Sequence, residues 1–156
     1  MAYVFSKAAR KLNQGAIDID TNKFKATLLT STGVSNVAEK NTSSTYASFT
    51  GAGNIVQKAA ANVTPIVVVI PAGTIDVAND EVEWRSTTTL SFTNLDTGQK
   101  VQGVLVFKSS GNTTTSPVVI LNDFTEGVLT TAAGSTVQVT FTGEGPIKTK
   151  QSGADL

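Results

Sequence analysis

The stretch VQGVLVF, residues 101–107, sets the fold class of this chain. Successive side chains of a β-strand point to opposite faces, so a strand with one face in water alternates apolar and polar residues. Here Leu105 and Phe107 make one face apolar. Val104 and Val106 make the other face apolar as well. The pattern predicts a strand that is covered on both faces, at the centre of a sheet.

Segments on either side repeat this apolar character at short intervals. They lie at residues 24–29, 66–70, 75–77, 82–84, 90–92, 117–121 and 137–141. Turn-forming residues separate them, so we expect about eight to ten short strands in an antiparallel β-sandwich or barrel, an all-β fold. The composition agrees, since the chain has 24 Thr and 18 Val, which are β-branched and favour strands.

The first fifteen residues have a different period. Their apolar residues recur at the spacing of an α-helix, with Ser6 at the N-cap and Gly15 where the helix ends. These apolar residues are Val4, Phe5, Ala8, Ala9 and Leu12. An isolated helix of this length is marginal in water, so it docks either on its own domain or on a neighbouring subunit. We expect a helical arm at 1–15, one β-domain at 16–150 and a flexible tail at 151–156.

Three segments carry more specific predictions. Residues 17–20 and 24–29 alternate on either side of a turn at 21–22, which predicts a β-hairpin. Residues 31–45 are small and polar, and we expect a loop there. The continuous run IVVVI at 66–70 predicts a strand buried on both faces, either in the domain core or at a subunit interface.

The residue types exclude several kinds of chemistry. The chain has no His and no Cys, which excludes a Ser-His-Asp triad, His- or Cys-ligated zinc, disulfides and a thiolate nucleophile. Asp18, Asp20 and Asn22 have the spacing that opens a calcium loop. However, Lys23 occupies the place of the required Gly and Leu29 that of the bidentate Glu. We therefore expect a turn and no metal site.

The acidic stretch near residue 81 has a structural explanation. Glu81 and Glu83 share one face of an expected strand. Val82 and Trp84 take the other face, where we expect Trp84 to anchor the core. Paired carboxylates can hydrolyse glycosidic bonds. Aromatic residues make up only 6% of the chain, so nothing else in the sequence indicates a cleft that binds sugar. The glycines at 51–56 lack the third Gly of a dinucleotide loop. We expect no catalytic residue, no cofactor and no enzyme activity.

The charge balance bears on partners. Twelve Lys and Arg offset twelve Asp and Glu, whereas nucleic-acid binding normally needs a basic excess. The basic cluster of Lys7, Arg10 and Lys11 is explained as a solvated helix face. The longest strongly apolar run has five residues, against about 20 for a membrane helix, and the N-terminus has no export pattern. We expect neither nucleic acid nor a membrane as partner.

Several segments together resemble a known family. Residues 17–21 (IDIDT) and 24–29 (FKATLL) follow the N-terminal element, and 79–84 (NDEVEW) lie in mid-chain. This order resembles small structural proteins of tailed bacteriophages. In those proteins a short helix ending in Gly leads into an Ile-Asp-Leu-Asp-Thr hairpin, a Lys-containing strand ending in Leu-Leu, and later an Asp-Asp-Val-x-Trp segment. Gly134 before the terminal strand at 137–141 is similar as well.

The resemblance implies a structural component of the virion, and the family has no catalytic residues to transfer. A head decoration or cement protein binds the assembled capsid late and stabilises it, so it is a pre-folded domain with little surface charge. Its expected partners are the major capsid protein and further copies of itself, in a closed trimer at a three-fold position. It would be made in the host cytoplasm and reside on the head surface of the virion.

Two other functions remain open. A neck or tail protein would build rings or tubes from the same fold, and its copy number would distinguish it from a decoration protein. A glycan-binding or adhesin β-sandwich normally presents a few exposed aromatic residues on a flat face. Tyr3, Tyr46 and Trp84 lie in unrelated contexts, which weighs against such a face.

The N-terminal element is the expected place of partner contact. It carries an apolar stripe on a helix that is too short to be stable alone. The contact residues of this hypothesis are Tyr3, Val4, Phe5 and Leu12, facing the capsid or a neighbouring subunit. Deletion of residues 1–14 is expected to weaken binding to the particle.

Overall fold

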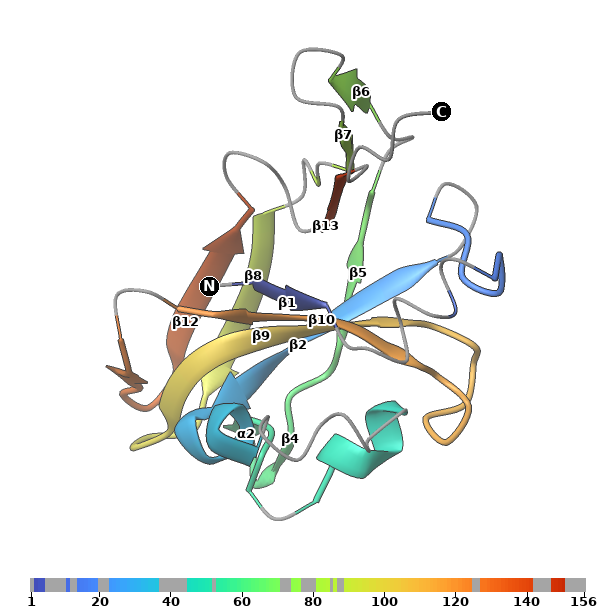
Figure 1. Ribbon diagram of the computed structural model, residues 1–156. Coiled ribbons are helices and arrows are strands. Elements are labelled where there is room, and N and C mark those ends of the chain that lie inside the picture. Colours follow the sequence, from blue (N-terminus) through green and yellow to red (C-terminus); the bar gives the residue numbers. More distant parts are fainter. Residues whose placement is uncertain are drawn as a thin grey trace, which may run out of the picture.

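The computed structural model shows an all-β chain, with 48% of residues in strands and 11% helical (Figure 1). It describes residues 2–4, 11, 14–19, 23–36, 45–51, 53–70, 74–76, 81–84, 86, 89–124, 127–141 and 147–150. For residues 2–4, 74–76, 81–84 and 147–150 it describes the backbone alone. The predicted fold class is confirmed, as a sandwich-like set of antiparallel sheets in which the barrel does not close.

Short strands dominate the part of the chain that is described. The elements are β1 (Ala2–Val4), β2 (Phe24–Thr30), α2 (Ser31–Ser35), the 3₁₀-helix η2 (Tyr46–Phe49), β3 (Gln57–Lys58), β4 (Ala61–Asn62), β5 (Ile66–Val68), β6 (Thr74–Asp76), β7 (Glu81–Trp84), β8 (Thr89–Leu95), β9 (Lys100–Lys108), β10 (Val118–Asp123), β11 (Leu129–Thr130), β12 (Ser135–Thr140) and β13 (Ile147–Lys150). The thirteen strands exceed the eight to ten expected, because several contain only two or three residues.

The central sheet contains the stretch from which the fold class was inferred. Its strands lie in the order β1-β10-β9-β2-β5, and β11 pairs with the start of β9. Residues 101–107 belong to β9, between β10 and β2, and all of them except Gln102 are buried. The prediction of a central strand that is covered on both faces is therefore confirmed.

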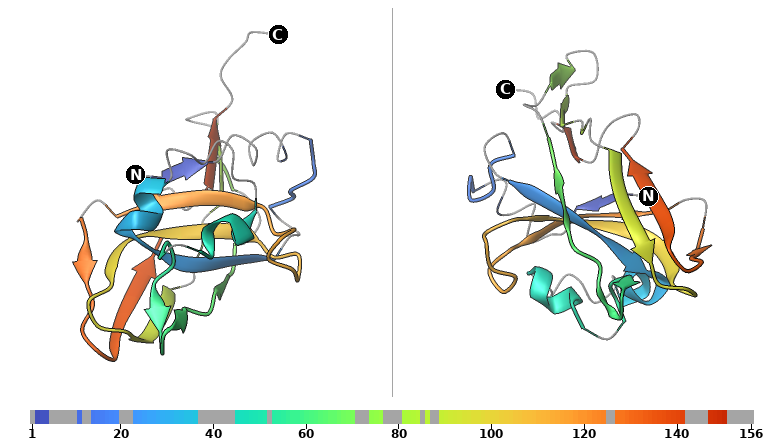
Figure 2. Two further views of the ribbon diagram at one scale, coloured as in Figure 1. Left: turned by 90° about the horizontal axis from the view of Figure 1, so that it is seen from below. Right: turned by 180° about the vertical axis from the view of Figure 1, so that it is seen from behind.

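A second layer is formed by β8 and β12, which pair with each other beside the central sheet (Figure 2). Along β8, Leu90 and Phe92 are buried, while Ser91 and Thr93 are exposed. This alternation gives β8 one face toward the core and one toward water. The buried residues of both sheets belong to one apolar cluster. A third sheet, β13-β7-β6, projects from one end of the molecule (Figure 1).

Two short helices lie against the central sheet. Tyr46 of η2 stacks on Phe107 of β9, with ring centroids 4.1 Å apart and planes 8° from parallel. Val34 of α2 comes close to β9 at Gly103, where an added Cβ would lie 2.9 Å from a Val34 methyl carbon. A glycine at this position therefore allows α2 to pack on β9.

The predicted loop at 31–45 begins as a helix. Ser31–Ser35 form α2, and Thr30 is its N-cap. The Thr30 hydroxyl oxygen accepts a hydrogen bond from the backbone N–H of Gly33 at 3.1 Å. A threonine cap satisfies one of the free N–H groups at a helix start, which explains why a polar stretch of small residues is helical here.

The predicted hairpin is wrong in its first strand. Residues 17–19 form turns and bends, although Ile17 and Ile19 are both buried. The second strand does form, as β2. Both edges of β2 are occupied, one by β9 and one by β5, so no edge remains with which residues 17–19 can pair.

Of the two places predicted for the run at 66–70, the domain core covers only one face of it, and burial of the other face at a subunit interface stays a prediction. Its first three residues form β5, the last strand of the central sheet, which pairs with β2. Val68 is 3% exposed, whereas Val67 and Val69 are 54% and 55% exposed. One face of this strand meets the core and the other meets water, so the two-residue alternation appears in a run whose residues are all apolar.

The N-terminal element starts as a strand, which corrects the predicted helix at its first residues. Ala2–Val4 form β1 at one edge of the central sheet, in antiparallel pairing with β10. The register places Tyr3 opposite Leu121. Pairing with an existing sheet satisfies the backbone groups of these residues, which is why the local helical spacing does not prevail here.

The end of the predicted helix agrees with the structure. Lys11 is helical, and Gly15 has a left-handed φ of +69°. The backbone N–H of Ala16 donates to the carbonyl of Lys11 at 2.9 Å, the bond that closes a helix at a left-handed glycine. Residues 5–10 and 12–13 of this prediction lie outside the described residues.

Three further predictions lie outside what the structure describes. They concern the loop residues 37–44, the tail at 151–156 and the side chain of Trp84, whose backbone belongs to β7. They stay predictions.

Candidate interaction surface

The structure places the backbone of two of the four predicted contact residues. Tyr3 and Val4 lie in β1, while Phe5 and Leu12 are outside the described residues. Because β1 is a paired strand of the central sheet, deleting residues 1–14 removes part of the fold. A loss of binding after that deletion would therefore not identify a contact surface, and point substitutions are needed.

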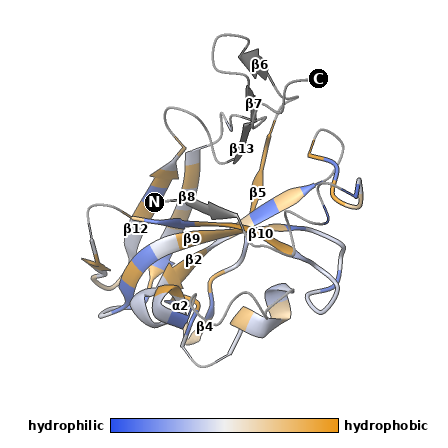
Figure 3. Cartoon of the chain, in the orientation of Figure 1, coloured by the Kyte–Doolittle hydropathy of each residue, from blue (hydrophilic) through white to orange (hydrophobic). Residues whose placement is uncertain are grey.

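Exposed apolar side chains indicate a different surface. Among the residues whose side chains are described, four large apolar ones are exposed, in two pairs. Val67 and Val69 lie on and just after β5, which is apolar along its length in Figure 3. Val128 and Leu129, at 46% and 45% exposed, lie at β11. The first pair is more exposed and belongs to a continuous apolar strand.

The outward direction of these valines is fixed by contacts on both sides of β5. Val68 pairs with Phe24 of β2, and both of these residues are buried. The Ser86 hydroxyl donates to the carbonyl of Val69 at 2.9 Å. With Val68 held against the core, the two-residue period directs Val67 and Val69 to the outside.

Lysine side chains adjoin the valines. Lys25 of β2 is the register partner of Val67, so the two residues share one face of the sheet. Lys23, one residue before β2, is exposed. Neither lysine has a carboxylate partner among the described residues. We call Lys23, Lys25, Val67 and Val69 the β2–β5 patch. Sequence reasoning named a subunit interface as one place for the run at 66–70, but it could not say which residues face outward, because the run contains no polar residue.

A small pocket adjoins the β2–β5 patch, between β5 and β8. Its volume is about 180 Å³, with Pro65 and Ile66 on one wall and Ser91 on the other. The buried Phe92 also lines it, together with the polar residues Lys58, Thr64 and Thr93. A cavity of about 150 Å³ holds benzene, whereas small-molecule sites measure about 300–1,000 Å³. The pocket is therefore smaller than a typical small-molecule site.

Burial raises the pKa of Tyr46 above its ordinary value of 10.0, and the Thr27 hydroxyl partly opposes this shift. The tyrosine ring is also held against Phe107. The neutral phenol is therefore the form that the folded protein favours, because the buried site solvates the phenolate poorly.

The raised pKa of Tyr46 predicts a loss of stability at alkaline pH. Above pH 10.0 the unfolded chain releases this proton more readily than the folded one, so the free energy of unfolding falls as pH rises. Below that pH Tyr46 is protonated in both states, and its contribution to the free energy of unfolding is fully present. Urea denaturation at pH 9 and 11 measures the fall, and Tyr46→Phe is expected to make it smaller. An equal fall in both proteins would contradict this assignment.

Neither recognised motifs nor known proteins assign a function to this surface. In the described part of the chain, no three Asp or Glu side chains gather to hold a metal ion. The helices described are too short or too polar to cross a membrane. No protein-family model, no curated protein and no solved structure matches the chain.

Proposed function

We propose that the chain is a structural protein of a tailed-phage virion, which binds the outside of the assembled head and stabilises it without catalysing a reaction. The observation that carries this proposal is the succession of residues 17–21, 24–29 and 79–84, which resemble the small virion proteins in the same order. The proposed partners are the major capsid protein and further copies of the chain, in a closed ring such as a trimer.

A domain that folds before it meets the particle supports this role. Leu28, Leu105 and Ile120 are fully buried members of one apolar cluster. The chain contains no cysteine, so its stability comes from this core without disulfides. The β2–β5 patch is built on paired strands, which hold it in a defined geometry for a partner.

The copy number of the chain in purified virions tests the proposal. Quantitative mass spectrometry would measure it relative to the major shell protein, with an abundant host protein as the control for carry-over. A ratio near one is expected for a protein that covers the head lattice. Absence from the particle would contradict any role in the virion.

A neck or tail position is the second candidate, because no described strand pairs with the outer edge of β1. β1 is the last strand on one side of the central sheet. Pairing of such an edge with a strand of the next subunit builds rings or tubes. The same mass-spectrometric measurement separates the two positions, since a neck or tail ring contributes only a few copies to each particle.

A glycan-binding module has less support. Tyr46 is buried and stacks on Phe107, so its ring is not presented to a sugar. For Tyr3 and Trp84 the structure describes the backbone alone. Specific binding on a glycan array, together with absence from virions, is the result that would favour this function.

A further inference from the structure

We infer that the β2–β5 patch is the surface that contacts the head, and that it meets there a protein surface with an apolar centre and carboxylates beside it. This inference rests on the proposed function, and it specifies which surface binds and what chemistry the partner surface has. It places binding on β2 and β5 rather than on the N-terminal element.

The apolar part of the patch lacks the protection that exposed edge strands usually have. Charged side chains commonly guard such strands against unwanted pairing. Residues 59–75 contain no charged residue. Pro65 and Pro71 limit the length of the strand, but Val67 and Val69 remain more than half exposed. A partner that covers these two valines removes the apolar surface from water.

The two lysines determine which partner fits. Lys23 and Lys25 have no carboxylate within the described residues to neutralise them. A second copy docked about a two-fold axis through the patch would bring four lysines together, which is unfavourable. A partner with carboxylates beside its apolar centre forms ion pairs and is steered toward the patch. Charge complementarity thus weighs against two copies joined patch to patch, and we assign the patch to the shell protein of the virion.

Binding of purified variants to particles assembled without the chain tests the contact, by co-sedimentation over a range of protein concentrations. The double variant Val67→Thr and Val69→Thr keeps side-chain size and β-branching but places two hydroxyls in the contact. Its affinity is expected to fall at least about fivefold. The double variant Lys23→Glu and Lys25→Glu is expected to lose at least about fivefold as well, and to flatten the dependence of binding on NaCl.

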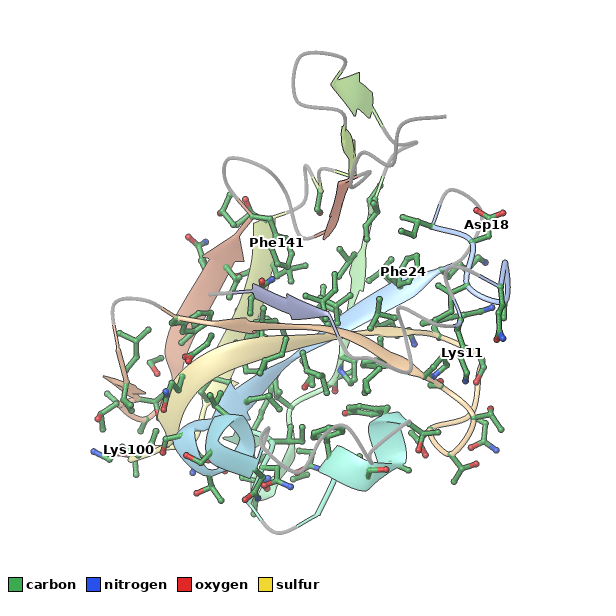
Figure 4. All side chains as sticks on the ribbon, in the orientation of Figure 1. Lys11, Asp18, Phe24, Lys100 and Phe141 are labelled. Atoms are coloured by element: carbon green, nitrogen blue, oxygen red, sulfur yellow. The ribbon has the colours of Figure 1, made fainter. Side chains whose placement is uncertain are left out.

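Matched controls come from the other exposed pair and from a distant lysine. Val128→Thr with Leu129→Thr likewise replaces two exposed apolar side chains by threonine, at β11. Lys100→Glu reverses a charge at the opposite end of β9 from Lys108, the register partner of Phe24 (Figure 4). Both controls are expected to bind within about twofold of the wild type.

The outcomes separate the contact from the function. If the wild type binds and the patch variants bind equally well, the surface assignment is wrong and the proposed function stands. If the wild type itself does not bind, both the proposed function and the assigned contact surface are wrong. Sedimentation velocity of the free proteins completes the test, because a smaller assembly in the valine variant would show that the patch joins copies instead.

Discussion

Gly33→Ala is expected to lower the free energy of unfolding by about 3 kcal/mol. The new Cβ would collide with the backbone carbonyl oxygen of Asn54 and lie 3.1 Å from its carbonyl carbon and 3.2 Å from its Cα. These are backbone atoms, so no side-chain rotation relieves the contact. Alanine is favoured over glycine inside a helix by about 1 kcal/mol, which offsets only part of the loss.

Asn54 cannot move away without further cost. Its carbonyl accepts the backbone N–H of Thr30 at 2.9 Å, and its side-chain oxygen accepts from the Asn36 amide at 2.7 Å. The next residues also bond to β2, since the N–H of Val56 donates to the carbonyl of Leu28. A shift of this segment would break its hydrogen bonds to the last residues of β2.

Urea denaturation followed by far-ultraviolet circular dichroism measures the effect of Gly33→Ala. Gly51→Ala is the matched control, because nothing lies within 4 Å of its added Cβ and its φ is not left-handed. Its stability is expected to stay within about 0.5 kcal/mol of the wild type. A similar change in both variants would mean that the packing of α2 against Asn54 does not limit stability.

Phe24→Ala is expected to lower the free energy of unfolding by about 3–5 kcal/mol. Phe24 is 1% exposed, and its register partners are Val68 of β5 and Lys108 of β9. Truncation removes apolar contacts and leaves a cavity that close-packed neighbours fill only in part. Domains of this kind have a free energy of unfolding of about 5–15 kcal/mol, so this one substitution removes a large fraction of it.

Denaturation curves of Phe24→Ala and Lys23→Ala provide the comparison. Lys23 is the preceding residue and is exposed, so its truncation is expected to change stability by no more than about 0.5 kcal/mol. Hydrogen exchange adds a local readout, because the loss of Phe24 loosens Val68 and is expected to speed exchange in β5. A loss of stability without faster exchange in β5 would show that Phe24 supports the core alone.

The strands were the most predictable part of the fold. Residues 101–107 are apolar on both faces, and a central strand is the position in which both faces are covered. Turn-forming residues between the strands were informative as well, since Gly98, between β8 and β9, takes the left-handed φ of +73° that glycine favours. Both features depend on local chemistry, which a single sequence contains.

The failed predictions concern pairing. Residues 17–19 have the alternation of a strand, yet they form turns because both edges of β2 are already occupied. Ala2–Val4 form a strand because β10 offers an edge to them. Neither outcome is visible in local periodicity, since each depends on a segment far away in the chain.

For the candidate contact surface, too, the sequence predicts one part and the tertiary structure decides the other. Composition and periodicity alone established an all-β chain with a long central strand, because side-chain alternation reflects burial directly. The five residues at 66–70 are equally apolar, so only their place at the edge of the sheet exposes Val67 and Val69. The neighbourhood of Lys25 and Val67 likewise arises from strand register, which brings remote residues side by side through hydrogen bonds that no local pattern specifies.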